Sequence, residues 1–138
     1  MARHGLSADD LGSLIADARR WVRFGVIKGI VDGDTFDAGL DLGYSVRISQ
    51  RFRLYGVNAP ERGQPGYIVA TMALTKIMKM NLGAELAIVT WRDRRDKYGR
   101  YIADFAVPMD GQASALTQRF QWASDLMLAS GTVEEYLP

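Results

Sequence analysis

Three short segments carry the residues of this chain that could do chemistry. The first is the turn D-G-D-T at 32–35, in which Asp32 and Asp34 can face the same point. Such a pair of carboxylates could hold Ca²⁺, which prefers several oxygen ligands. The segment is not an EF-hand, because Asp37 and Gly43 occupy the positions at which that loop needs glycine and glutamate. Taken alone, the segment also fits a solvated hairpin turn.

The second segment, residues 51–62, combines cations with a candidate general base. Alternation along a strand would place Arg51 and Arg53 on the face opposite Phe52. An arginine beside an acidic turn can clamp a phosphate with two parallel hydrogen bonds. Glu61, which follows the proline that ends the strand, could activate a water molecule. An ordinary exposed strand followed by a charged loop is the alternative for this segment alone.

The third segment is the charged run R-D-R-R-D-K-Y-G-R at 92–100. Its five cations and one tyrosine suit contacts to phosphates and stacking on bases. Asp93 and Asp96 stand among these cations, so a solvated run that compensates its own charge is the alternative.

The residue types that are absent narrow the chemistry further. The 138 residues include no Cys and a single His, at position 4. The lack of Cys excludes disulfides, thiolate zinc sites and Cys nucleophiles, and one His argues against His-based triads and multi-His metal sites. The near-neutral net charge of +1 hides a strongly basic centre, because residues 47–100 alone carry +7. That asymmetry favours an anionic partner, with a solvated basic face as the alternative.

The elements that must position these segments follow from hydrophobic periodicity. Alternating and β-branched stretches predict five strands, the third of them bent, at 24–31, 35–40, 44–57, 84–91 and 101–107. Helical spacing predicts helices at about 7–20 and 67–81, and one or two more within 113–130. This order predicts an α+β fold that is rich in β-structure: a five-stranded Greek-key barrel of the OB type with about three helices. We expect a helical N-terminal extension over 1–22 and the barrel domain over 23–138.

Taken together and in this order, the segments resemble the staphylococcal nuclease (thermonuclease) family. The likeness spans about 27–107 and rests on D-G-D-T, on R-L-x-G-x-x-A-P-E and, after a helix, on D-K-Y-G-R. It implies the same OB-type fold and a Ca²⁺-dependent nuclease, for which another divalent cation could substitute. The implied reaction is hydrolysis of phosphodiester bonds in DNA or RNA, single-stranded or frayed, with little sequence preference.

The resemblance also implies a metal site and a general base. Asp34 matches the main metal-ligating carboxylate, and Asp32 matches the nearby acidic residue that supports it. Asn58 falls where the family has a second metal carboxylate, and the backbone carbonyl of Ala59 would complete the site. Glu61 matches the glutamate generally assigned to activate the attacking water.

The remaining matches concern the substrate. Arg53 and Arg100 match the two guanidiniums that grip the phosphate. Lys97 and Tyr98 match residues that contact a flanking phosphate, and Tyr136 stands loosely where a tyrosine stacks on a base.

Asn58 is the main departure from the family pattern. An amide still offers an oxygen ligand, but it removes one negative charge from the site. The chain could therefore be an active enzyme with weaker or different metal binding, or one in which Asp32 compensates. It could also be a non-catalytic OB-type module that binds nucleic acid or protein. Activity is favoured, because the charged residues of the family pattern are all present: Asp34, Arg53, Glu61 and Arg100.

No apolar run reaches the roughly 18 residues of a membrane-spanning helix. The first 23 residues also lack the apolar core of a signal peptide. These features predict a cytoplasmic protein without membrane contact.

Overall fold

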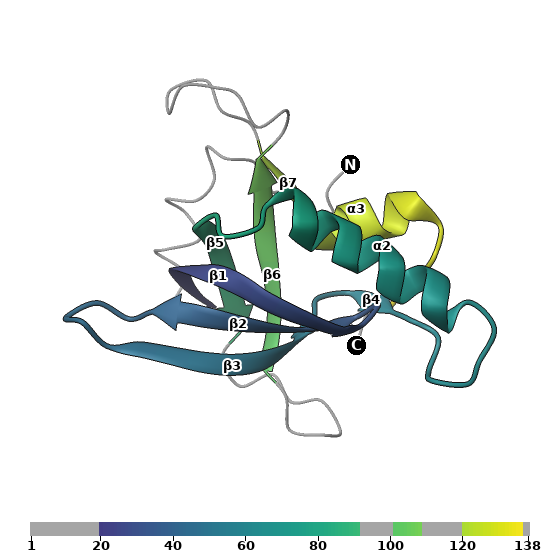
Figure 1. Ribbon diagram of the computed structural model, residues 1–138, viewed down its shortest axis with the longest axis horizontal. Helices are drawn as coiled ribbons and strands as arrows, with labels where there is room; N and C mark the ends of the chain where they lie inside the picture. The colour runs from purple at the N-terminus through teal and green to yellow at the C-terminus, as the bar shows by residue number, and fades with distance from the viewer. Residues whose placement is uncertain (1–19, 92–100, 109–119, 137–138) are drawn as a thin grey trace.

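The computed structural model describes residues 20–91, 101–108 and 120–136. Within these ranges five strands form a closed barrel (Figure 1). They are β1 (Arg20–Asp32), β2 (Thr35–Asp41), β3 (Arg47–Leu54), β5 (Leu86–Trp91) and β6 (Tyr101–Pro108). Neighbouring strands run antiparallel in the order β3-β2-β1-β5-β6, and a parallel pairing of β3 with β6 closes the barrel. The prediction of a five-stranded α+β barrel is therefore confirmed.

Shorter elements complete the described part of the chain. They are β4 (Val57–Asn58), α2 (Tyr67–Met80), β7 (Phe120–Trp122), α3 (Ala123–Ser130) and β8 (Glu134–Glu135). Helix α2 packs against β1, α3 packs against β6, and the two helices contact each other on the same side of the barrel (Figure 1). Strand β4 pairs with β8, and β7 extends the sheet beyond β6.

Large apolar side chains fill the barrel. Phe36 packs edge-on against Phe105, with ring centroids 5.1 Å apart, and lies 5.6 Å from the ring of Phe52. All three rings are buried, as are Leu54 and Leu74 beside them. Burial of each such side chain contributes about 1.5–3 kcal/mol, so this cluster dominates the packing energy of the barrel. Because Phe52 and Leu54 point inward, the intervening Arg53 is directed away from the core.

A buried carboxylate fastens α3 to the barrel. Asp104 on β6 is fully buried and accepts hydrogen bonds from the backbone N–H groups of Phe105 and Ser124, at 2.9 and 3.1 Å. The Ser124 hydroxyl also donates to it. The carboxylate thereby satisfies an N–H in the first turn of α3, which has no side-chain cap of its own.

Three expectations about the elements need correction. The predicted third strand is interrupted: Tyr44 and Ser45 lie in a turn with left-handed φ angles of 55° and 64°. Gly56, with φ of 69°, then separates β3 from β4. Residues 120–122 were expected within a helix but form strand β7, because Phe120 and Trp122 pair with Pro108 and Ala106.

The predicted N-terminal helix and the predicted number of helices can be compared only with the described residues. The expected first helix, at about 7–20, lies outside the described residues except for Arg20, which begins β1. Residues 20–22 of the expected helical extension are thus strand. Two helices are described where about three were predicted. No helix among the described residues is both long enough and apolar enough to cross a membrane.

Candidate active site

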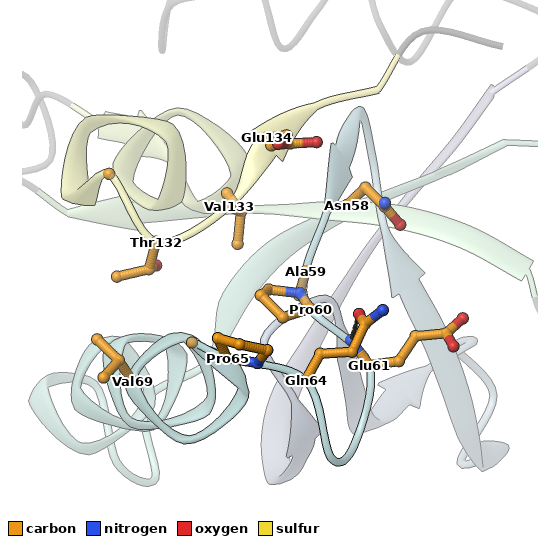
Figure 2. Close-up of a pocket in the computed structure, with 12 residues that line it drawn as sticks. Asn58, Ala59, Pro60, Glu61, Gln64, Pro65, Val69, Thr132, Val133 and Glu134 are labelled. Carbon is orange, nitrogen blue, oxygen red and sulfur yellow. Dashed lines mark hydrogen bonds between the residues drawn. The ribbon is translucent and has the colours of Figure 1, made fainter.

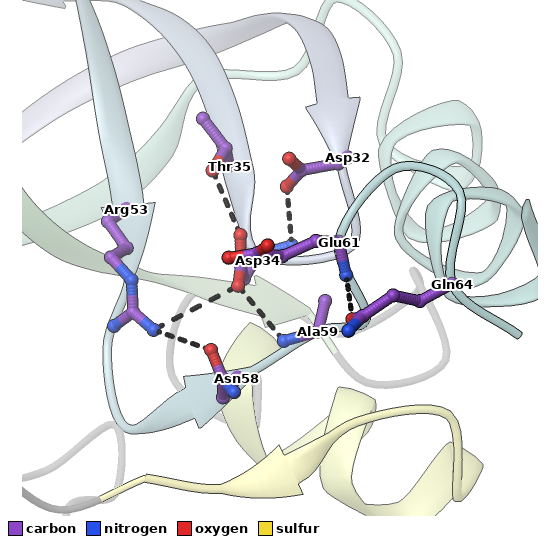
Figure 3. Close-up of polar contacts among 8 residues, drawn as sticks. All are labelled: Asp32, Asp34, Thr35, Arg53, Asn58, Ala59, Glu61 and Gln64. Carbon is purple, nitrogen blue, oxygen red and sulfur yellow. Dashed lines mark hydrogen bonds and ion pairs between the residues drawn. The ribbon is translucent and has the colours of Figure 1, made fainter. Parts of the chain in front are cut away.

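The turn between β1 and β2 holds the Asp34 carboxylate in place with hydrogen bonds to both of its oxygens (Figure 3). The Thr35 hydroxyl donates to Oδ1 at 3.0 Å, and the Ala59 backbone N–H donates to Oδ2 at 2.9 Å. The Asp34 N–H donates in turn to Asp32 Oδ1 at 3.1 Å, which fixes the turn itself. Asp34 is only 9% exposed. This carboxylate is therefore positioned before any ligand arrives.

Gly33 allows this turn to lie close against α2. A Cβ atom at Gly33 would lie 2.7 Å from the Cβ of Ala70 and 2.9 Å from the Cβ of Ala59. Real Cβ atoms do not approach so closely, so only glycine fits here without a shift of the helix. The sequence D-G-D thus packs the acidic turn against both α2 and the chain that follows β4.

Arg53 lies beside this turn and is itself buried, at 8% exposure. Its Nη2 donates to Asn58 Oδ1 at 3.3 Å and lies 3.9 Å from Asp34 Oδ2 (Figure 3). The backbone supports the approach, because the Leu54 N–H donates to the Asp34 carbonyl at 2.7 Å. Asp34 of the first sequence segment is thus brought into one cluster with Arg53 and Asn58 of the second.

Arg51, two residues before Arg53, occupies a different environment. It is exposed and donates twice to Asp37, at 2.8 and 3.1 Å. The expected alternation is confirmed, since Phe52 is buried in the core between these two arginines. Arg53 is buried all the same, and its guanidinium contacts Asn58 of β4 and the ring of Tyr136, which follows β8.

Tyr136 belongs to that cover. Its ring lies over the guanidinium of Arg53, with Cζ 4.9 Å from the ring centroid, a cation–π distance. The Tyr136 N–H donates to the Gly56 carbonyl at 2.8 Å, next to the pairing of β4 with β8. Tyr136 therefore lies beside the cluster, and its described contact is with Arg53. Stacking on a nucleobase stays a prediction.

Glu61 stands on the loop between β4 and α2, and its side chain is exposed. The loop is braced by Gln64: the Glu61 N–H donates to Gln64 Oε1 at 2.8 Å, and the Gln64 N–H donates to the Glu61 carbonyl at 2.9 Å (Figure 3). The backbone of Glu61 is thus fixed while its carboxylate faces solvent. This suits a general base that must reach a water molecule.

The two carboxylates of the turn influence each other. Burial, followed by the hydrogen bond to Asp34 and its negative charge, raises the pKa of Asp32 from 3.8 to about 6. A cation bound at this turn would favour the ionised form of Asp32 and so oppose the rise of its pKa.

The donor set at this turn consists only of hard oxygen ligands. Within 20–91, 101–108 and 120–136, no three His, Cys, Asp or Glu side chains gather as a metal-holding group. The candidates are the carboxylates of Asp32 and Asp34, the Asn58 amide oxygen and the Ala59 carbonyl. Hard cations such as Ca²⁺ accept this mixture and add water molecules, so the donor chemistry fits such an ion. Asn58 would contribute less than a carboxylate, since its oxygen is already shared with Arg53.

Three predicted substrate contacts, Lys97, Tyr98 and Arg100, lie outside the described residues. Arg100 directly precedes Tyr101, which pairs with Phe52, the neighbour of Arg53. The chain therefore returns to β3 at the residue after Arg100.

Sequence reasoning missed two supporting residues and one strand. Thr35 follows Asp34 in the D-G-D-T turn, and Gln64 lies three residues after Glu61. Because each is so close in sequence, its side chain could have been predicted to hydrogen-bond to the neighbouring site residue. Strand β8, which covers the site, has only two residues and carries no periodic signal.

Comparison with known proteins adds no assignment to this site. Neither the family models nor the curated proteins compared with the sequence give a match. The chemistry of the site therefore rests on its own geometry: a buried arginine, two adjacent carboxylates, an amide and an exposed glutamate.

Proposed function

We propose that this chain is a metal-dependent nuclease, with Ca²⁺ or another hard divalent cation as cofactor. It would hydrolyse phosphodiester bonds of single-stranded or frayed DNA or RNA with little sequence preference. The closed five-stranded barrel is consistent with the OB-type Greek-key fold that the family resemblance implies, and that resemblance supports the proposal.

The observation that carries the proposal is the incomplete pairing of Arg53. In the described part of the chain, both of its polar partners, Asn58 and Asp34, lie at Nη2. The Nε and Nη1 groups have no hydrogen-bond acceptor among those residues. A buried guanidinium with unused donors is costly unless a ligand completes it. Its geometry matches two oxygens of a phosphate.

The other residues would divide the work around that phosphate. Asp34, held by Thr35 and Ala59, keeps the guanidinium oriented and offers oxygens to a cation. Glu61, on its braced loop, would accept a proton from the attacking water. A bound divalent cation would supply electrostatic stabilisation of the negative charge that grows on the phosphoryl oxygens. Arg100 is the second guanidinium that the resemblance implies.

A non-catalytic OB-type binding module is the second candidate, and Asn58 favours it. With an amide at this position of β4, the two carboxylates of the turn are not joined by a third acidic side chain among the described residues. A phosphate could still bind Arg53 in such a module, without turnover.

Digestion assays separate the two candidates. Single-stranded DNA and RNA are incubated with the protein in Ca²⁺, Mg²⁺, Mn²⁺ or EDTA. The variant Arg53→Ala is compared with Arg51→Ala, which removes an exposed arginine two residues away. The nuclease predicts metal-dependent cleavage that Arg53→Ala abolishes and Arg51→Ala retains. Salt-sensitive binding without cleavage in any metal would instead support the binding module.

A further inference from the structure

An open groove of about 770 Å³ adjoins the candidate active site (Figure 2). It lies between the start of α2 with its preceding loop and the segment that links α3 to β8. Its lining residues are Asn58, Ala59, Pro60, Glu61, Gln64, Pro65, Gly66, Val69, Gly131, Thr132, Val133 and Glu134. The volume lies within the range of about 300–1,000 Å³ that is typical of small-molecule sites.

The groove is continuous with the site. Asn58, Ala59 and Glu61 belong to both, so a molecule in the groove would lie next to a phosphate held by Arg53. Asn58 also pairs with Glu134 across β4 and β8. Side chains directly opposite each other in such a pair lie on the same face of the sheet. Glu134 therefore faces the groove beside Asn58.

The groove has apolar walls and an acidic rim. Figure 2 shows Val69 of α2 and the residues Thr132 and Val133 on opposite sides of the groove, with the prolines of the loop between them. Among the residues that the structure describes, the lining contains two carboxylates, Glu61 and Glu134, and no lysine or arginine.

One wall of the groove is formed in advance. The loop from Glu61 to α2 is held by the hydrogen bonds between Glu61 and Gln64, and the Tyr67 N–H donates to the Gln64 carbonyl at 3.2 Å. The Gln64 amide oxygen is used in this bracing, which leaves its NH₂ group able to donate to a ligand.

We propose that this groove binds the nucleoside that adjoins the cleaved phosphodiester bond, and that it selects substrates whose strand ends at that nucleoside. This inference rests on the proposed nuclease function. A base fits between the valine and proline walls, and Glu134 accepts hydrogen bonds from sugar hydroxyls or base amino groups. A longer strand would carry its next phosphate along a groove whose described lining offers two carboxylates and no lysine or arginine, which is unfavourable.

A binding experiment tests the occupant. Adenosine is titrated into the wild type and into Val69→Trp, which fills the groove, with NMR shifts or calorimetry as the readout. Met72→Trp is the matched control, because Met72 is exposed on the same helix but does not line the groove. We expect Val69→Trp to weaken adenosine binding at least about tenfold, and Met72→Trp to change it less than about twofold. Melting curves verify that both variants are folded.

A kinetic experiment tests the selection of strand ends. We would measure kcat/KM, per phosphodiester bond, for a dinucleoside monophosphate and for a long single strand. The ratio of the two values is compared between the wild type, Glu134→Lys and Glu135→Lys. Both residues are exposed on β8 and undergo the same charge change, but only Glu134 lines the groove. The wild type should prefer the dinucleoside substrate. Glu134→Lys should reduce that preference about five- to tenfold at low salt, and Glu135→Lys by no more than about twofold.

The outcomes separate this proposal from the nuclease itself. Suppose that the protein cleaves long strands and that Val69→Trp does not affect adenosine binding. This result would overturn the groove assignment and leave the nuclease intact. Adenosine binding that only Val69→Trp abolishes, in a protein that cleaves nothing, would overturn the nuclease and retain the nucleoside site. If a lysine-rich peptide binds the groove and adenosine does not, the proposal is wrong and the acidic rim serves a protein partner.

Discussion

Replacing Arg53 with lysine isolates the shape of the guanidinium from its charge. In the wild type, Arg53 Nη2 lies 3.9 Å from Asp34 Oδ2. Lysine would keep a positive charge near Asp34, but it cannot offer the two parallel donors, Nε and Nη1, of the guanidinium. Loss of one preorganised donor to a transition state typically lowers kcat by about 10²–10³, equivalent to about 2.7–4 kcal/mol. We therefore expect Arg53→Lys to lower the cleavage rate by that factor.

The effect on stability should be much smaller. The variant loses the 3.3 Å hydrogen bond to Asn58, which is equivalent to about 1 kcal/mol of the free energy of unfolding. The assay pairs single-turnover cleavage of a labelled single strand with urea unfolding. Arg51→Lys is the control, because it perturbs only the exposed pair with Asp37 and should leave the rate within about twofold. A rate for Arg53→Lys within about threefold of the wild type would refute the role of Arg53 as a phosphate fork.

Three further predictions concern the framework of the site. Asp104→Ala should lower the free energy of unfolding in urea by about 2–4 kcal/mol, because it strands the Ser124 donors in a fully buried position. Asp32→Asn should raise the melting temperature of the metal-free protein at pH 7 and weaken its Ca²⁺ binding in calorimetry. Because the pKa of Asp32 is raised to about 6 on folding, the wild type should lose stability relative to this variant as the pH rises from 4 to 6. Gly33→Ala should cost about 1–3 kcal/mol in unfolding experiments and slow cleavage, since its Cβ forces the acidic turn away from α2. Unchanged unfolding curves for any of the three would contradict the corresponding contact.

The barrel could be predicted because its strands carry their own local signals. Residues at alternating positions in β2 and β3, such as Phe36 and Phe52, face one core, so periodicity alone identifies them. The same logic failed at 120–122, where helical spacing of apolar residues suggested a helix. Pairing of Trp122 with Ala106 on β6 overrides that local preference. The break at Gly56 likewise depends on a left-handed backbone that the pattern of hydrophobic residues does not encode.

The site could be predicted only in part. Residue types and motif order identified Asp34, Arg53 and Asn58, but not how they meet. The contact between Asp34 and the Ala59 N–H joins residues 25 positions apart, and it depends on the close packing of Gly33 against α2. Tyr136 reaches Arg53 only because β8 pairs with β4, a pairing of two residues on each strand.

Asn58 has a structural consequence for the arginine. Its amide oxygen accepts a hydrogen bond from Arg53 without adding a negative charge. Among the described residues, Asp34 at 3.9 Å is the one anionic group that pairs with the guanidinium, so its positive charge is less fully offset and attracts an anionic ligand more strongly. An aspartate at this position would strengthen a cation site, but it would also bind Arg53 more tightly.

The dependence of cleavage on metal and on Asp34 tests the central claim most directly. A labelled single-stranded oligonucleotide is incubated with protein while Ca²⁺ is added, removed by a chelator and restored, for the wild type and for Asp34→Ala. The nuclease predicts cleavage that starts with the metal, stops with the chelator, returns when the metal is restored, and is absent in Asp34→Ala. Cleavage that persists in the chelator, or an oligonucleotide that binds the intact protein and is never cut in any divalent metal, would contradict it.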